Sequence, residues 1–273
     1  MRVKIICISL QQAIERRQHM TDLLNNIGFE WEFFDAYDGQ NIKIINDKIF
    51  YNNAFTGYYH DASKFLLDQI EQFGRIHYKK IHDIPYTLDI SAIIDQENAW
   101  IVKQEQFQFF ININYFRHRT MILNEIGCAL SHYNVIKMLQ YDEDYDAYLV
   151  LEDDVYLIGD LNRIIKQAEW YDLIWNILFL NIPGYGGHPG FIEPNTQTTF
   201  SNDFNLHVFS HYSSACSYLV NKNWTLNEDY INLPFDVYLS RRIDLLQLRI
   251  KEPVFMVDYT KLSKDSTINV EIF

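Results

Sequence analysis

Three adjacent carboxylates, Glu152, Asp153 and Asp154, directly follow the apolar run 147–151. An apolar run of this length predicts a strand that is buried on both faces. Charged carboxylates at its end would be destabilised by desolvation and mutual repulsion, so a counter-charge is expected there. Open α/β sheets bind ligands at the carboxyl ends of their parallel strands, and carboxylate oxygens suit a divalent cation carrying a phosphorylated substrate. The alternative is a solvated acidic turn without a chemical role.

A second sequence block, upstream of the acidic triplet, strengthens the functional interpretation of the triplet. Residues 123–132 read LNEIGCALSH and precede the acidic strand. Together with Arg16 and Arg17, the FDAYDG run at 34–39 and the LEDDV run at 151–155, this block resembles glycosyltransferase family 25. That family includes bacterial lipopolysaccharide and lipooligosaccharide β-galactosyltransferases. The resemblance is carried by residues 1–40 and 120–160.

The resemblance implies a GT-A type fold, a Rossmann-like αβα sandwich that binds a nucleotide-sugar donor and a metal. It implies an inverting transfer of a hexose, with galactose expected, from a UDP-sugar to an oligosaccharide or glycolipid acceptor in lipopolysaccharide or lipooligosaccharide synthesis. A DxD-like motif holds Mn²⁺ or Mg²⁺ in that fold, which assigns the metal to Glu152, Asp153 and Asp154. The cation neutralises charge that develops on the departing diphosphate.

An inverting transfer also needs a base that takes the proton of the acceptor hydroxyl. Family members carry an aspartate after a proline, and Asp236 matches it behind Pro234. Asp236 is therefore the first candidate for the base and Asp153 the second. Alternatively, Asp236 only complements the dipole of the helix that Pro234 opens.

The resemblance places Arg16, Arg17 and Glu125 at the donor, whereas a solvated helix face is the alternative for the arginines. The first strand ends in Ser9, where the family usually has asparagine. Cys128 and His132 lie four residues apart on a predicted helix and could touch. We expect both to be structural rather than a nucleophilic pair.

The periodicity predicts an α/β chain that opens with strand 3–8, helix 14–27 ended by Gly28, and strand 29–34. A helix over 124–140 is expected next, with Asn124 as its N-cap, and then helix 161–170. The first of these helices should turn an apolar stripe inward, formed by Ile126, Ala129, Leu130, Tyr133 and Ile136. Further strands are expected at 147–151, 177–180, 206–209, 216–220 and 254–257. We expect one catalytic domain over 1–273, with 41–119 as an insertion or acceptor-side lobe.

The lobe should hold a helix at 61–73 and strands or short elements at 86–94 and 106–113. It also contains His60, His77 and His82, a zinc site only in the less favoured interpretation. The glycine-rich run 183–190 is either a loop that closes over a donor or a slack connection.

A net charge of −13 argues against general nucleic-acid binding. No apolar stretch reaches the roughly 18 residues of a transmembrane helix, and we expect no signal peptide. Three dispersed cysteines suggest reduced thiols in the cytoplasm. Peripheral contact with the inner membrane would need a local basic patch, whose candidates are Arg241, Arg242, Arg249 and Lys251. A solvated helix face is the favoured interpretation of those residues.

Two rival functions remain at this stage. A catalytically silent sugar-binding or scaffold protein would share the donor site without turnover. A haloacid-type, metal-dependent phosphatase also places an acidic motif at a strand end. That class needs an aspartate nucleophile on its first strand, whereas Glu152 occupies the first position here and the strand is a later one.

Overall fold

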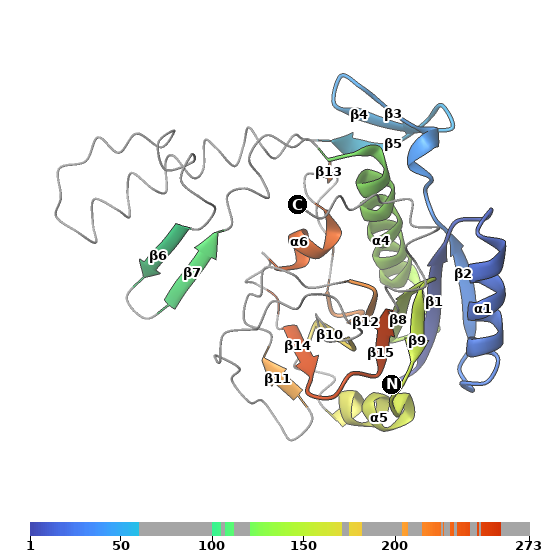
Figure 1. Cartoon of the computed structure of the whole chain (residues 1–273), viewed down its shortest axis with the longest axis vertical. Coiled ribbons are helices and arrows are strands. Elements are labelled where there is room, and N and C mark those ends of the chain that lie inside the picture. Colours follow the sequence, from blue (N-terminus) through green and yellow to red (C-terminus); the bar gives the residue numbers. More distant parts are fainter. Residues whose placement is uncertain are drawn as a thin grey trace.

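The computed structural model describes residues 1–59, 100–104, 107–111, 121–170, 175–181, 204–206, 215–224, 226, 230–231, 234–240, 245 and 247–257. Its centre is a mixed sheet (Figure 1), which confirms the α/β class. Across the sheet the strands are β11 (Phe204–Leu206), β14 (Gln247–Ile250), β10 (Ile177–Phe179), β12 (Ser217–Asn221), β8 (Ala147–Glu152), β1 (Val3–Ser9) and β2 (Trp31–Asp35).

The predicted strand–helix–strand opening is confirmed, because α1 (Ile14–Leu24) connects β1 to β2, and the two strands pair in parallel. β1 also pairs in parallel with β8, whereas β12 runs antiparallel to β8 and to β10. The register places Ile8 beside Glu152 and Ser9 beside Asp35. The carboxyl ends of β1, β2 and β8 therefore form one edge of the sheet.

Both faces of the sheet are covered. Tyr148 and Val150 of β8 lie in a core cluster with α4 (Leu123–Tyr141) and α6 (Phe235–Ser240). Leu149 and Leu151 point the other way, into a cluster with α1 and α5 (Leu161–Trp170). These side chains are at most 2% exposed, which confirms that the strand is buried on both faces. Each contributes about 1.5–3 kcal/mol through burial.

Helix α4 presents its predicted apolar stripe to the core, with Ile126, Leu130 and Ile136 buried. The prediction of Asn124 as its N-cap is wrong, because the cap is Ile122 and Asn124 lies in the first turn. The physical reason is Glu125, whose carboxylate accepts a hydrogen bond of 3.0 Å from the backbone N–H of Ile122. That bond satisfies a donor at the helix start without an asparagine cap.

Other boundaries shift slightly. α1 ends at Leu24 rather than at residue 27, and a turn leads to Gly28, whose positive φ of 83° reverses the chain. α5 has the predicted bounds. The strand predicted at 206–209 begins two residues earlier, as β11 at Phe204, and residues 207–209 lie outside the described residues.

The segment after residue 41 begins as a small sheet. η1 (Gly39–Asn41) leads into β3 (Ile42–Ile45), β4 (Lys48–Tyr51) and β5 (Ala54–Tyr59), and β13 (Tyr230–Ile231) completes the sheet in the order β13-β5-β4-β3. β6 (Trp100–Gln104) and β7 (Phe107–Ile111) form a hairpin, and β9 (Val155–Leu157) pairs with β15 (Phe255–Val257). The elements predicted at 61–73 and 86–94, the three histidines and the 183–190 run lie outside the described residues.

The two glycine-containing motifs meet at close range. A Cβ atom on Gly127 of α4 would lie 2.2 Å from the carbonyl oxygen of Tyr37, and one on Gly39 would lie 2.2 Å from Oδ1 of Asn124. The Tyr37 N–H donates a hydrogen bond of 3.0 Å to Ser131 Oγ in the same contact. Glycine is therefore required here because backbone packs directly on backbone.

Replacing Gly127 by alanine should destabilise the fold by about 1–3 kcal/mol, because the new methyl group cannot avoid the Tyr37 carbonyl. Thermal unfolding would show a melting temperature lower by roughly 2–4 °C per kcal/mol. Gly57→Ala in β5 is the matched control, since its Cβ meets no described atom within 4 Å. Equal melting temperatures for the two variants would contradict the close approach.

Candidate functional site

The acidic triplet lies where the sequence predicts, at the carboxyl end of β8. Glu152 is the last residue of the strand, and its N–H donates to the carbonyl of Cys216 at 2.9 Å. Asp153 and Asp154 form the tight turn that leads into β9. The side chains of Glu152, Asp153 and Asp154 each lie in a different environment.

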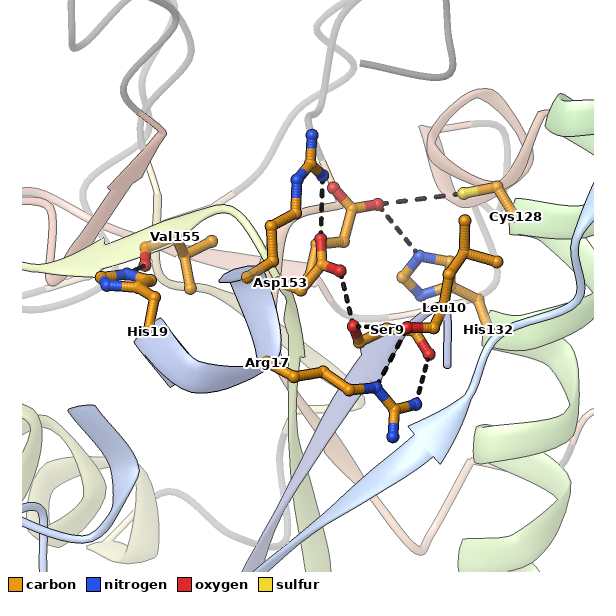
Figure 2. Close-up of polar contacts among 10 residues, drawn as sticks. Ser9, Leu10, Arg17, His19, Cys128, His132, Asp153 and Val155 are labelled. Atoms are coloured by element: carbon orange, nitrogen blue, oxygen red, sulfur yellow. Dashed lines mark hydrogen bonds and ion pairs between the residues drawn. The ribbon is translucent and has the colours of Figure 1, made fainter. Parts of the chain in front are cut away.

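Asp153 is almost fully buried and already has a counter-charge. Its Oδ2 accepts a hydrogen bond of 2.6 Å from Ser9 Oγ at the end of β1 (Figure 2). Its Oδ1 accepts one of 3.0 Å from Nη1 of Arg16 in α1. Asp153 therefore joins β8, β1 and α1, and it holds one of the two predicted donor-binding arginines at this edge of the sheet.

Asp154 is in a less favourable environment. Burial, followed by the charges of Glu152 and Asp153, raises the pKa of Asp154 to about 8, although Arg16 acts in the opposite direction. Its Oδ1 is covered from solvent and accepts no hydrogen bond within the described part of the chain. A buried carboxylate of this kind needs a compensating positive charge to remain ionised near neutral pH.

Glu152 points toward α4, where a thiol and an imidazole face the same oxygen. Its Oε1 lies 3.3 Å from Nε2 of His132 and accepts from Cys128 Sγ at 3.8 Å. Figure 2 shows Cys128 and His132 pointing toward this carboxylate. His132 is fully buried, with Nδ1 2.9 Å from the hydroxyl of Tyr218 and its ring stacked 4.5 Å from that of Phe235.

Asp236 joins the site through α6. It follows Phe235, so the stacking on His132 fixes the start of this short helix beside α4. The pKa of the Cys128 thiol is raised by burial, then by the charges of Glu152, Asp236 and Asp154. These three carboxylates therefore act on one buried sulfur atom. Asp236 also lies in the first turn of α6, where its charge complements the helix dipole.

Arg17 ties the ends of two strands together. Its guanidinium donates to the carbonyls of Ser9 and Leu10 at 2.8 and 3.0 Å (Figure 2), and it pairs with Asp35 at the end of β2. The guanidinium also lies 4.6 Å from the centre of the Phe33 ring. These contacts give Arg17 a structural role. Glu125 has one too, because it caps the start of α4. A donor-binding role for either residue stays a prediction.

Several residues of the site are missed by sequence reasoning. Ser9 is noticed only as a departure from the family, yet it supports Asp153. Tyr218 carries no signal beyond a buried strand pattern, and Phe235 none beyond its place before Asp236. Their role in holding the His132 ring follows only from their positions in the folded chain.

The favoured interpretation of residues 241–251 as a solvated helix face is wrong at Arg249, and so is its candidacy for a basic patch. Arg249 lies in β14 and is 3% exposed, because both faces of the sheet are covered. Its guanidinium lies 5.7 Å from the centre of the Phe179 ring. Residues 241–242 lie outside the described residues. Among the described helices, none is both long and apolar enough to cross a membrane.

Comparison with known proteins places this geometry in context. Residues 2–226 match the model of glycosyltransferase family 25, described as an LPS biosynthesis protein. The chain is similar to a glycosyltransferase 25 family member of Drosophila pseudoobscura pseudoobscura, with 27% identity over 179 residues. It is 26% identical to the corresponding protein of Drosophila melanogaster over the same length. These alignments cover 63% of this chain and 20% of each relative, so the chain spans about a fifth of their length.

Among solved structures, A197 from STIV covers 93% of this chain, and 83% of A197 is matched in turn. The identity is 7% and the TM-score is 0.39.

The raised pKa of Asp154 predicts a pH dependence of stability in metal-free protein. Between the ordinary value of 3.8 and about 8, the folded chain retains a proton that the unfolded chain has released. The free energy of unfolding should therefore fall as pH rises through this window, with no penalty below it. In chelator, Asp154→Asn should gain stability over the natural chain progressively toward pH 8, as measured by urea unfolding. The exposed Asp144→Asn is the control, and a pH-independent difference for Asp154→Asn would contradict the assignment.

Proposed function

The chain belongs to glycosyltransferase family 25, and on this premise we propose that it is an inverting, metal-dependent glycosyltransferase with a GT-A type fold. It moves a hexose, for which we propose galactose, from a UDP-sugar to a saccharide acceptor. The proposed acceptor is an oligosaccharide or glycolipid of lipopolysaccharide or lipooligosaccharide synthesis, in line with the family description. The observation that carries the proposal is the buried carboxylate of Asp154 at the carboxyl end of β8.

The residues at this edge fit a hard divalent cation. Asp154 has a covered oxygen without a hydrogen bond from the described residues, and Glu152 beside it is 31% exposed. Asp153 is already compensated by Arg16 and Ser9, so we assign the metal first to Asp154 and Glu152. When bound, Mn²⁺ or Mg²⁺ neutralises charge on the departing diphosphate.

Arg16 is the first candidate among the donor-binding residues. Its bond to Asp153 holds the guanidinium at the end of β8, beside the proposed cation ligands. A guanidinium suits phosphate oxygens because its N–H groups form a planar fork. Arg17 and Glu125 support this arrangement indirectly, through the end of β1 and the start of α4.

Asp236 is the candidate base for the acceptor hydroxyl. Both oxygens of Asp153 already accept hydrogen bonds, which makes Asp153 the weaker candidate. Asp236 lies on α6, a different element from the proposed metal ligands, so it can face the acceptor while Asp154 faces the diphosphate. A carboxylate there accepts the hydroxyl proton as the new glycosidic bond forms.

We propose that the protein works in the cytoplasm, as a peripheral partner of the inner membrane where its acceptor is a glycolipid. The described cysteines, Cys7, Cys128 and Cys216, are all free thiols, in keeping with a reducing compartment.

Asp154→Ala should abolish Mn²⁺-dependent donor binding and transfer while the chain stays folded. The natural chain should be stabilised by UDP-galactose with Mn²⁺, by about 2.7 kcal/mol at roughly 100-fold saturation. A thermal-shift screen of UDP-sugars with and without Mn²⁺ measures this directly, and Asp144→Ala on the exposed turn before β8 is the control. Full transfer by Asp154→Ala, or in excess chelator, would contradict the metal role.

Assays of transfer and of UDP-sugar hydrolysis, run with the donor that the screen identifies, separate the rival functions. Donor binding without transfer, and without hydrolysis of the UDP-sugar, is expected of a silent binding protein. Transfer to a saccharide acceptor with release of UDP is expected of the proposed enzyme.

Asp236→Asn should leave donor and metal binding intact, because the charge at the diphosphate is unchanged. Transfer should fall by roughly 10²–10⁴-fold if Asp236 is the base. If it only complements the dipole of α6, the change should cost at most about 1 kcal/mol of stability and little rate. Donor affinity, melting temperature and turnover measured on this variant distinguish the two roles. Near-normal turnover would remove Asp236 from the mechanism and leave Asp153 as the candidate.

A further inference from the structure

We propose that Cys128, His132 and Glu152 form a zinc site, distinct from the proposed donor-cation site. One ligand atom of each residue, Sγ, Nε2 and a carboxylate oxygen, lies within 4.8 Å of the other two. The cluster joins α4 to the end of β8. This inference goes beyond the proposed function, which assigns no metal-binding role to Cys128 or His132, and it replaces the purely structural role that the sequence indicates.

The separations of Glu152 Oε1 from the other two ligand atoms are close to those of tetrahedral zinc. Zinc bonds of about 2.0–2.3 Å at tetrahedral angles separate the ligand atoms by roughly 3.3–3.7 Å. The structure has 3.3 Å between Glu152 Oε1 and His132 Nε2, and 3.8 Å between the same oxygen and Cys128 Sγ. These side chains can therefore accept the ion with little rearrangement.

The surroundings of His132 are those of a metal ligand. Its second nitrogen, Nδ1, lies 2.9 Å from the hydroxyl of the buried Tyr218, and its ring stacks on Phe235. Metal-binding histidines are commonly fixed in this way through the nitrogen that does not bind the ion. Cys128 and His132 are one helical turn apart on α4, so both present their ligand atoms on one face.

The ligand types select the metal. A thiolate and an imidazole favour zinc, whereas Mg²⁺ and Mn²⁺ favour oxygen ligands. The neighbouring carboxylate of Asp236 adds negative charge that a divalent cation offsets. Three protein ligands leave a fourth position for water or an oxygen of a bound molecule, as in catalytic rather than closed structural zinc sites.

The zinc site shares only Glu152 with the donor-cation site. Oε1 faces Cys128 and His132, and Oε2 is the second oxygen through which Glu152 can reach the donor cation. Variants at Cys128 and His132 therefore test the zinc site, whereas variants at Asp154 test the donor cation.

The test uses the full chain, stripped with chelator and reloaded with Zn²⁺ or Co²⁺. We expect stoichiometric zinc by elemental analysis after dialysis, and the near-ultraviolet thiolate-to-cobalt absorption of the Co²⁺ form. Cys128→Ser should lose the thiolate absorption and His132→Asn should lose most of the bound zinc. The matched controls, Cys7→Ala in β1 and His19→Asn in α1, should keep both, and circular dichroism checks that each variant folds.

A natural chain that retains no zinc, or that binds cobalt without thiolate absorption, would overturn the proposal. The same holds if Cys128→Ser leaves the absorption unchanged. If His132→Asn does not fold, the spectra of the natural chain and of Cys128→Ser still decide. Asp154→Ala should keep the cobalt absorption while it loses Mn²⁺-dependent UDP-galactose binding, so failure of the zinc site and failure of the proposed function give different results.

Discussion

The desolvation of three carboxylates at the end of a doubly buried strand determines the architecture of this site. Both faces of the sheet are covered at β8, so Glu152, Asp153 and Asp154 at its end cannot all reach bulk water. Each carboxylate needs a local partner, because a buried charge without one destabilises the fold by more free energy than any single contact provides. Asp153 accepts hydrogen bonds from Arg16 and Ser9. Glu152 lies close to the imidazole of His132 and accepts a hydrogen bond from the thiol of Cys128. Asp154 is left with a raised pKa and a covered oxygen, and the donor cation that we propose would supply the positive charge that this carboxylate lacks.

The close packing of α4 against the loop after β2 makes these polar contacts of the carboxylates possible. Gly127 and Gly39 let the start of α4 pack directly on the loop after β2, where a larger side chain at either position would clash. His132 then reaches Glu152, and its stacking on Phe235 brings α6 and Asp236 to the same place. The family motifs that look unrelated in sequence, FDAYDG, EIGCALSH and LEDDV, are thus parts of one packed unit.

Much of this fold can be predicted from the sequence, because apolar runs and helical periodicity report burial directly. They indicate β8, α5 and the inward stripe of α4 correctly. The partners of the polar groups cannot be predicted in this way, since they depend on tertiary placement. Ser9 beneath Asp153, Tyr218 behind His132 and Arg17 across two strand ends belong to segments far apart in sequence. The cap of α4 and the burial of Arg249 are misjudged for the same reason: a local pattern does not show which neighbour supplies the hydrogen bond or covers the side chain.

The most direct test of the central claim is to locate the donor cation in a crystal of the full chain grown with Mn²⁺ and UDP. Anomalous diffraction at the manganese edge identifies the ion without reference to activity. The account predicts manganese bound to Asp154 and to the diphosphate oxygens at the carboxyl end of β8, with Asp153 still paired to Arg16. UDP bound at this edge with no manganese beside Asp154, or manganese and UDP bound at another part of the chain, would contradict it.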